Sequence, residues 1–117
     1  DSLMQVAAAG LPYYIHTNDN NGKLDWDLIA GACNVWEFAE FLFYLKELEY
    51  DGWITADVAP FRQDPFEIFA LNARFTQQVW NWLDQIDRNQ IRTHLKNHNF
   101  LEIRKLMEPC IFPALKQ

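Results

Sequence analysis

Residues 11–27, with the sequence LPYYIHTNDNNGKLDWD, contain a short apolar run that passes directly into a polar loop. The run Leu11–Thr17 is rich in aromatic and β-branched residues and is bounded by turn residues, which is typical of a short buried strand. In the loop, Asn20, Asn21 and Gly22 are residues that favour tight turns. The stretch therefore predicts a strand followed by a turn.

The segment after this loop predicts a helix and then a second strand. Asn34 and Glu37 have the spacing of a capping box at the start of a mostly apolar run that ends near Leu48. Beyond an Asp-Gly turn, residues 53–58, WITADV, form another short apolar run that we expect to be a buried strand.

More helices are expected after the second strand. Asp64 is followed by a proline and supplies the cap of a helix that should run to about Ile86. Two shorter helical patterns cover residues 90–96 and 100–108, and the second should end at Pro109.

The order of these elements indicates an α/β fold. Residues 2–9 look like the last turns of a helix that ends at Gly10, so the chain reads helix, strand, helix, strand, helix. Strands that alternate with helices are typical of parallel β/α units, but a parallel sheet needs several strands and two covered faces. We therefore expect this chain to be part of a larger α/β protein.

Composition excludes some classes of partner. The chain has 117 residues, of which 50% are hydrophobic and 15% aromatic, which is enough for a packed core. Its formal charge of −6 disfavours nucleic acid, because binding to phosphates relies on clustered lysine and arginine. The sequence has no apolar run of the roughly 18–20 residues that span a bilayer, so we expect no membrane partner and a cytoplasmic protein.

Polar residues follow both predicted strands. His16 lies near the end of the first strand and Asp57 near the end of the second, and the carboxyl ends of parallel strands open on one side of a sheet. Asp25 and Asp27 are two residues apart in the intervening loop, so both could bind one hard cation. Histidine with carboxylates suits Mn²⁺, Mg²⁺ or Co²⁺. The same residue types are common in metal-free turns, so spacing alone leaves both interpretations open.

The joint pattern resembles a known family. The segments YYIHTNDNNGKLDWDLIAG and YDGWITADVAPFRQDP, separated by an amphipathic helix, are similar to the last two β/α units of the xylose isomerase-like TIM barrels. These are metal-dependent sugar isomerases and epimerases, commonly oligomeric. The resemblance covers residues 10–85. It implies that residues 1–86 are the end of a (β/α)8 barrel and that residues 87–117 are a helical arm for packing or homo-oligomerisation.

The resemblance also implies a metal site. In that family the seventh and eighth strands end in metal ligands, and two-metal isomerases carry an Asp-x-Asp pair in the loop between them. The matching positions are His16, Asp25, Asp27 and Asp57. Mn²⁺ is the first expectation, with Mg²⁺ or Co²⁺ as alternatives. Asn18 and Arg62 match positions near the substrate, and Trp26 could stack on a sugar or pack the loop against the rim.

Two departures limit what the resemblance implies. The most similar epimerases have a substrate-contacting arginine where this chain has Gly22, and xylose isomerases have a lysine where it has Ala59. The Asp-x-Asp pair favours an isomerase that interconverts aldose and ketose over a one-metal sugar epimerase. The family's ligands on earlier strands have no counterpart here, so we expect the 117-residue chain alone to be inactive.

Two other classes of function remain open. The chain could be a non-catalytic module that oligomerises through exposed strand edges and its C-terminal helices. It could also belong to a metal-dependent DNA-repair endonuclease on a related barrel, although that class needs a basic groove and this chain carries a charge of −6.

Overall fold

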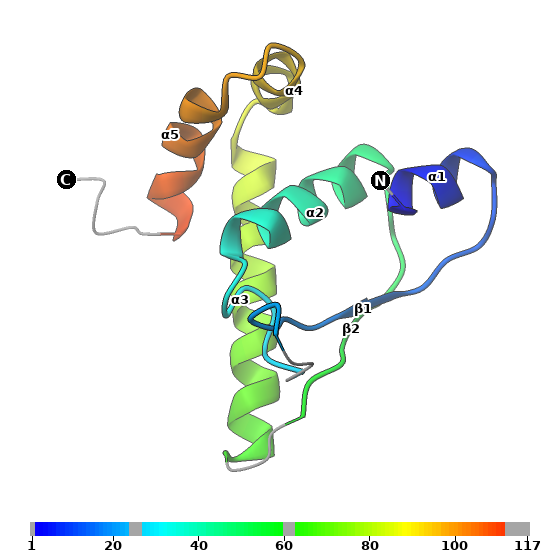
Figure 1. The fold of residues 1–117 in the computed structure, drawn as a ribbon, viewed down its shortest axis with the longest axis vertical. Coiled ribbons are helices and arrows are strands. Elements are labelled where there is room, and N and C mark those ends of the chain that lie inside the picture. The colour runs from blue at the N-terminus through cyan, green and yellow to red at the C-terminus, as the bar shows by residue number, and fades with distance from the viewer. Residues whose placement is uncertain (1, 24–26, 60–62, 112–117) are drawn as a thin grey trace. The chain divides into compact units, whose positions relative to one another are not determined.

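The structure is a computed structural model that describes residues 2–23, 27–59 and 63–111 (Figure 1). Within these ranges the elements follow the predicted order, and the structure is a helix-rich arrangement with a two-stranded parallel sheet, which is compatible with the expected α/β class. The elements are α1 Ser2–Ala8, β1 Ile15–Thr17, α2 Val35–Glu47, β2 Ile54–Ala56, α3 Pro65–Gln85, α4 Arg88–Lys96 and α5 Phe100–Ile111.

The chain divides into two compact units, Asp1–Thr76 and Gln77–Gln117. The first unit holds α1, both strands, α2 and the first half of α3, while the second holds the rest of α3 with α4 and α5. The boundary expected at residue 86 separates the end of the barrel from the helical arm that the family resemblance implies. It stays a prediction.

The two strands pair in parallel. The register joins Ile15 to Ile54, His16 to Thr55 and Thr17 to Ala56. The backbone N–H of Asp57 then donates to the Thr17 carbonyl at 2.9 Å, so the pairing continues beyond β2. Both strands are shorter than predicted, because a strand is defined by its ladder and the ladder joins residues 15–17 to residues 54–56.

The predicted cap at the end of α1 and the predicted cap at the start of α3 are both confirmed. Gly10, after α1, has a φ of 69°, and the Leu11 N–H donates to the Val6 carbonyl at 3.2 Å, as in a left-handed C-terminal cap. At the start of α3, the Asp64 carboxylate accepts from the Phe66 N–H at 2.9 Å.

The capping box predicted for α2 is wrong. Asn34 occupies the N-cap position, but its side chain makes no capping hydrogen bond. Its amide group donates instead to the Asp19 carboxylate and to the Asn20 carbonyl. The Asn34 side chain, which the sequence predicted to cap α2, therefore binds the loop after β1 instead.

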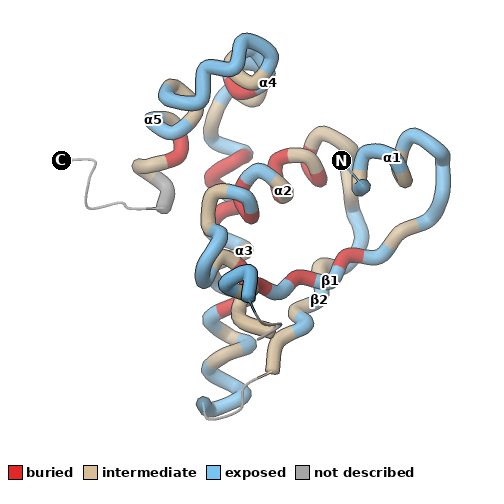
Figure 2. Tube along the Cα trace, viewed as in Figure 1, coloured by how far each residue is buried: buried red, intermediate tan, exposed pale blue. Residues whose placement is uncertain are grey.

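Helix α2 supplies most of the buried apolar residues of the first unit (Figure 2). Its Phe38 stacks on Phe75 of α3, with ring centroids 5.9 Å apart. The loop before α2 also contacts α3, because the Ala30 N–H donates to the Asn72 side chain at 2.9 Å. Gly31 lies so close to the Phe75 ring that a side chain there would overlap it.

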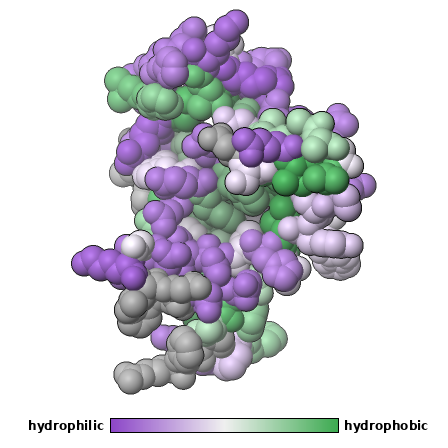
Figure 3. All heavy atoms as spheres, turned by 45° about the vertical axis from the view of Figure 1, so that its right-hand side comes forward, coloured by the Kyte–Doolittle hydropathy of each residue, from purple (hydrophilic) through white to green (hydrophobic). Residues whose placement is uncertain are grey.

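In the second unit, α4 and α5 are short amphipathic helices. Asp87 caps α4 by accepting from the Asn89 N–H at 2.9 Å, and Ile91 is the buried residue of this helix. Hydrophilic side chains gather over α4, at the top of the view in Figure 3. The prediction that the last helix ends at Pro109 is wrong, because α5 continues to Ile111 with the proline in its final turn, where it removes only one backbone hydrogen bond.

None of the helices in the described ranges combines the length and the apolar character needed to cross a bilayer.

Candidate functional site

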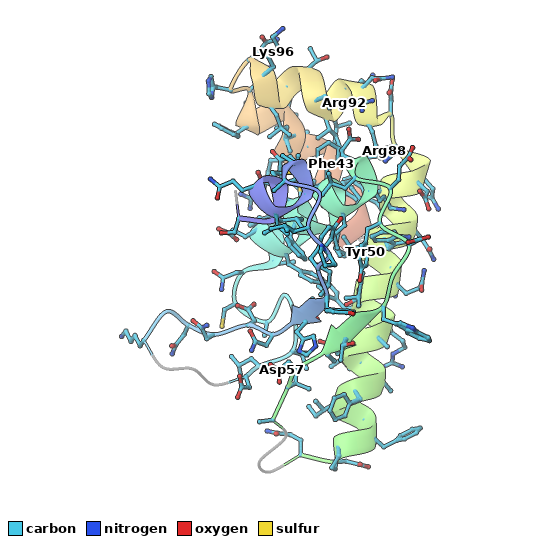
Figure 4. The ribbon with its side chains drawn as sticks, turned by 90° about the vertical axis from the view of Figure 1, so that its right-hand side faces the viewer. Phe43, Tyr50, Asp57, Arg88, Arg92 and Lys96 are labelled. Carbon is cyan, nitrogen blue, oxygen red and sulfur yellow. The ribbon has the colours of Figure 1, made fainter. Side chains whose placement is uncertain are left out.

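The predicted ligands His16 and Asp57 lie at the same edge of the sheet. His16 is in register with Thr55, and Asp57 is two residues further along that strand. Successive side chains alternate between the faces of a strand, so all three project from one face. Each of them is exposed, and Asp57 lies just beyond the end of β2 (Figure 4). The parallel register therefore brings His16 and Asp57 to one face at the carboxyl edge.

This face of the sheet is uncovered in the described chain. Tyr14 and Trp53 precede the two strands at matching positions, and their exposed fractions are 90% and 88%. On the opposite face Ile15 and Thr17 are buried. The sheet is therefore covered on one side, and the uncovered side carries both the aromatic pair and the two predicted ligands.

Asp27 is held in the loop beside this edge. The Asn18 side-chain amide donates to the Asp27 carboxylate at 3.0 Å, and the Asp27 carbonyl accepts from the Ala59 N–H at 3.0 Å. Asp27 has a φ of 47°, a left-handed conformation that aspartate tolerates better than most residues. Asn18 therefore orients a predicted metal ligand in this structure, and its contact with a substrate stays a prediction.

Three of the predicted site residues cannot be placed. Asp25, Trp26 and Arg62 lie outside the described residues. Among the residues that are described, no group of three or more histidine, cysteine, aspartate or glutamate side chains is arranged to hold a metal ion. His16, Asp27 and Asp57 thus lie at or beside the ends of the two strands, but the structure does not bring the three together as a group that could hold a metal ion.

The predicted turn in the loop is confirmed. The Asn20 side chain accepts from the Gly22 N–H at 2.8 Å, and the Asn21 side chain accepts from the Lys23 N–H at 3.0 Å. Gly22 has a φ of 79°, which glycine adopts without steric cost. These side-chain-to-backbone bonds are the usual means by which asparagine stabilises a turn.

Asp19 is a key residue that the sequence reasoning missed. Only 6% of it is exposed, and one carboxylate oxygen accepts from the Cys33 and Asn34 N–H groups, both at 2.8 Å. The other oxygen accepts from the Asn20 N–H at 2.8 Å and from the Asn34 side chain. Asp19 also pairs with Leu28 in an isolated antiparallel bridge. It closes the loop and joins the end of β1 to the start of α2.

The environment of Asp19 keeps it ionised. Burial by itself would raise the pKa of this carboxyl, but the hydrogen bonds from Asn34, Cys33 and Asn20 outweigh burial and hold the pKa below its ordinary value. Because these bonds occupy both oxygens, Asp19 serves as a structural anchor and not as a free metal ligand. The alternation of β1 could have identified it, since residues 15, 17 and 19 all fall on the buried side.

A cavity of ≈ 250 Å³ lies where the end of β1 meets the first turns of α2. His16 and Asn18 line it on the strand side, and Asn34 and Glu37 line it on the helix side. The cavity therefore adjoins the edge that carries the predicted ligands.

No protein-family model, curated protein or solved structure matches this chain.

Proposed function

We propose that this chain is the C-terminal part of a divalent-metal-dependent sugar isomerase with a TIM-barrel fold, which interconverts an aldose and a ketose. One observation carries the proposal: the parallel register of β1 and β2 puts His16 and Asp57 on one uncovered face, at the carboxyl edge. Barrel enzymes assemble their active sites from groups at the carboxyl ends of their strands. The sequence resemblance supplies the chemistry.

The available donors suit Mn²⁺ and similar ions. His16 offers an imidazole nitrogen, while Asp27 and Asp57 offer carboxylate oxygens, which is the mixture that Mn²⁺, Mg²⁺ and Co²⁺ accept. The hydrogen bond from Asn18 fixes the carboxylate of Asp27, as outer partners of metal ligands generally do. Further ligands would come from Asp25 and from preceding strands of the proposed barrel.

A bound divalent ion would act as a Lewis acid toward the carbonyl and hydroxyl oxygens of an open-chain sugar. The residues of this chain would orient the ion and the sugar. His16 in β1 and Asp57 just after β2 would supply ligands from two neighbouring strands, and the hydrogen bond from Asn18 to Asp27 would hold the loop beside them. A neutral sugar does not need a basic binding surface. The formal charge of −6 of this chain therefore agrees with a sugar substrate.

The proposal is tested by adding Mn²⁺ to the isotope-labelled chain and recording paramagnetic broadening of backbone NMR signals. We expect selective broadening at His16, Asp27 and Asp57, weakened by Asp57→Asn. Asp51→Asn is the matched control, because Asp51 is an exposed aspartate before the same strand, at its opposite end. Broadening that follows acidic residues generally, or that is unchanged in Asp57→Asn, would contradict the assignment.

Activity needs a chain that carries the rest of the proposed barrel. In that protein we expect aldose–ketose interconversion that is lost with a chelator and restored by Mn²⁺. Asp57→Asn should lower both metal affinity and turnover. Turnover that survives chelation would exclude the metal-dependent isomerase, and interconversion of epimers alone would assign the chain to the epimerase branch.

The uncovered face also favours a second candidate, the non-catalytic oligomerisation module. Exposed aromatic side chains such as Tyr14 and Trp53 commonly mark protein contacts. This candidate predicts a stable oligomer whose size does not change when a chelator is added, which size-exclusion chromatography measures. A monomer at all concentrations would exclude it.

A further inference from the structure

The loop after β1 contains the one Asn-Gly pair of the sequence, Asn21 and Gly22. Asparagine is a chemically labile residue, because its side-chain carbonyl can be attacked by the backbone nitrogen of the next residue. Glycine offers that nitrogen with the least steric hindrance, since it has no Cβ. Both residues are exposed, and no described atom beyond the chain neighbours of Gly22 lies within 4 Å of where a Cβ would be. The pair therefore joins reactive groups to open access for water.

Two hydrogen bonds of the loop act on the reacting groups in opposite directions. The Lys23 N–H donates to Oδ1 of Asn21 at 3.0 Å, and it would stabilise the negative charge that develops on this oxygen during an attack. The Gly22 N–H donates to Oδ1 of Asn20 at 2.8 Å. The Gly22 nitrogen must lose its proton before it attacks, so the attack also costs this hydrogen bond. The loop thus activates the carbonyl of Asn21 and restrains the nitrogen of Gly22.

We propose that Asn21 is a site of spontaneous deamidation, which the Lys23 N–H promotes and the Asn20 side chain slows. This inference goes beyond the proposed function, because the reaction needs no metal ion, no sugar and no other part of a barrel. It depends only on residues 20–23, all of which the structure describes.

The reaction balances with water as its only co-reactant. Hydroxide takes the proton of the Gly22 N–H, the nitrogen forms a bond to Cγ of Asn21, and the bond from Cγ to Nδ2 breaks. The amide nitrogen takes one proton from water and leaves as ammonia, so a succinimide ring remains. One water molecule then opens the ring at either of its carbonyl groups, which leaves aspartate or isoaspartate at position 21. Nothing is oxidised or reduced.

The two products differ in their effect on the loop. Aspartate keeps an oxygen that can accept from the Lys23 N–H, and it adds one negative charge. Isoaspartate carries the backbone through the side-chain carbon, which adds a methylene group to the chain between Asp19 and Leu28. These two residues close the loop by exchanging backbone hydrogen bonds of 2.9 and 2.8 Å. Isoaspartate therefore lengthens a segment whose ends are joined.

The test is incubation of the purified 117-residue chain at neutral and mildly alkaline pH in water enriched in heavy oxygen, followed by peptide mapping with mass spectrometry. We expect one solvent oxygen at position 21 and release of ammonia, both faster at the higher pH because hydroxide removes the proton. Asn99 is the internal control, since it is an exposed asparagine followed by Phe100. It should stay unmodified over the period in which Asn21 reacts.

Asn20→Ala tests the restraint on the Gly22 nitrogen. The variant removes the acceptor of the Gly22 N–H, and it keeps the backbone groups of Asn20 that bond to Asp19 and Asn34. Deamidation of Asn21 should become faster by about two- to tenfold, the factor that one net hydrogen bond represents.

Two further variants separate this effect from a general loosening of the loop. Asn18→Ala removes a different hydrogen bond of the same loop, the one to Asp27, and it should leave the rate at Asn21 unchanged. Asn21→Gln keeps an uncharged amide but places its carbonyl one methylene group further from the Gly22 nitrogen, and it should abolish the modification.

Three results would overturn the proposal. Deamidation no faster at Asn21 than at Asn99 would show that the loop does not favour the reaction. A rate that is unchanged or lower in Asn20→Ala would remove the restraining role of Asn20. Equal acceleration by Asn20→Ala and Asn18→Ala would mean that loosening of the loop, and not release of the Gly22 N–H, sets the rate.

Discussion

At the scale of single residues, the carboxylate of Asp19 connects two segments of the first unit. Its oxygens accept hydrogen bonds from the loop after β1 and from the two residues that precede α2. The neighbouring positions 16 and 18 point to the exposed side and carry the candidate chemistry, while Asp19 holds the buried side. The alternation of side chains along β1 thus places the candidate functional residues His16 and Asn18 on the exposed side and the structural residue Asp19 on the buried side.

Asp19→Asn should lower the free energy of unfolding by about 2–4 kcal/mol, because an NH₂ group would replace one oxygen that faces N–H donors, and hydrogen bonds to charged groups contribute about 1.5–3 kcal/mol each. Urea denaturation in the presence of a chelator measures this. The control is Asp57→Asn, an exposed aspartate whose change should stay within about 0.5 kcal/mol. Equal effects of the two substitutions would contradict the anchoring role of Asp19.

The lowered pKa of Asp19 predicts how stability depends on pH. The unfolded chain binds this proton near the ordinary pKa of 3.8, and the folded chain binds it only at lower pH. The contribution of Asp19 is therefore fully present above pH 3.8 and is lost as the pH falls through the folded-state pKa. The stability difference between the wild type and Asp19→Asn should be constant near neutrality and shrink in acid. A difference that grows in acid would mean that the pKa is raised.

At the scale of the elements, Gly31 controls how the loop before α2 packs on α3. Gly31→Ala should lower the free energy of unfolding by about 1–2 kcal/mol for the left-handed backbone and by a further 1–3 kcal/mol for overlap with the Phe75 ring. Gly22→Ala is the matched control, because Gly22 has a similar φ and nothing lies within 4 Å of an added Cβ. Thermal unfolding of both variants separates steric overlap from backbone strain, and equal losses would contradict the close approach to Phe75.

The elements also show how far the sequence could predict this structure. Local signals were sufficient where one segment determines its own conformation, as at the caps of Gly10 and Asp64. They failed at Asn34, because its amide group is taken by Asp19, fifteen residues away in the sequence. Strand lengths depend on partner strands, which no local pattern contains. The candidate edge with His16 followed from the general geometry of parallel strands, whereas the cavity between the end of β1 and α2 depends on tertiary packing.

At the scale of the whole molecule, the two faces of the sheet differ in a way that matches the proposed barrel. The face with Ile15 and Thr17 is buried, while the face with His16 and Asp57 is open. In a barrel the helices cover one face of the strands, and the other face forms the packed interior, with the active site at its carboxyl end. The exposed Tyr14 and Trp53 lie at the opposite end of this face, where a barrel would pack them as interior residues.

This difference predicts that the energetic role of Trp53 depends on the length of the chain. In the 117-residue chain, Trp53→Ser should change the free energy of unfolding by no more than about 0.5 kcal/mol, because the side chain is 88% exposed. Leu42→Ala, at a fully buried position of α2, should cost about 2–5 kcal/mol in the same chain. In a longer protein that adds preceding β/α units, burial should raise the cost of Trp53→Ser to about 3–5 kcal/mol. Urea denaturation of both lengths measures the change, and a cost that stays small in the longer protein would show that no barrel interior forms on this face.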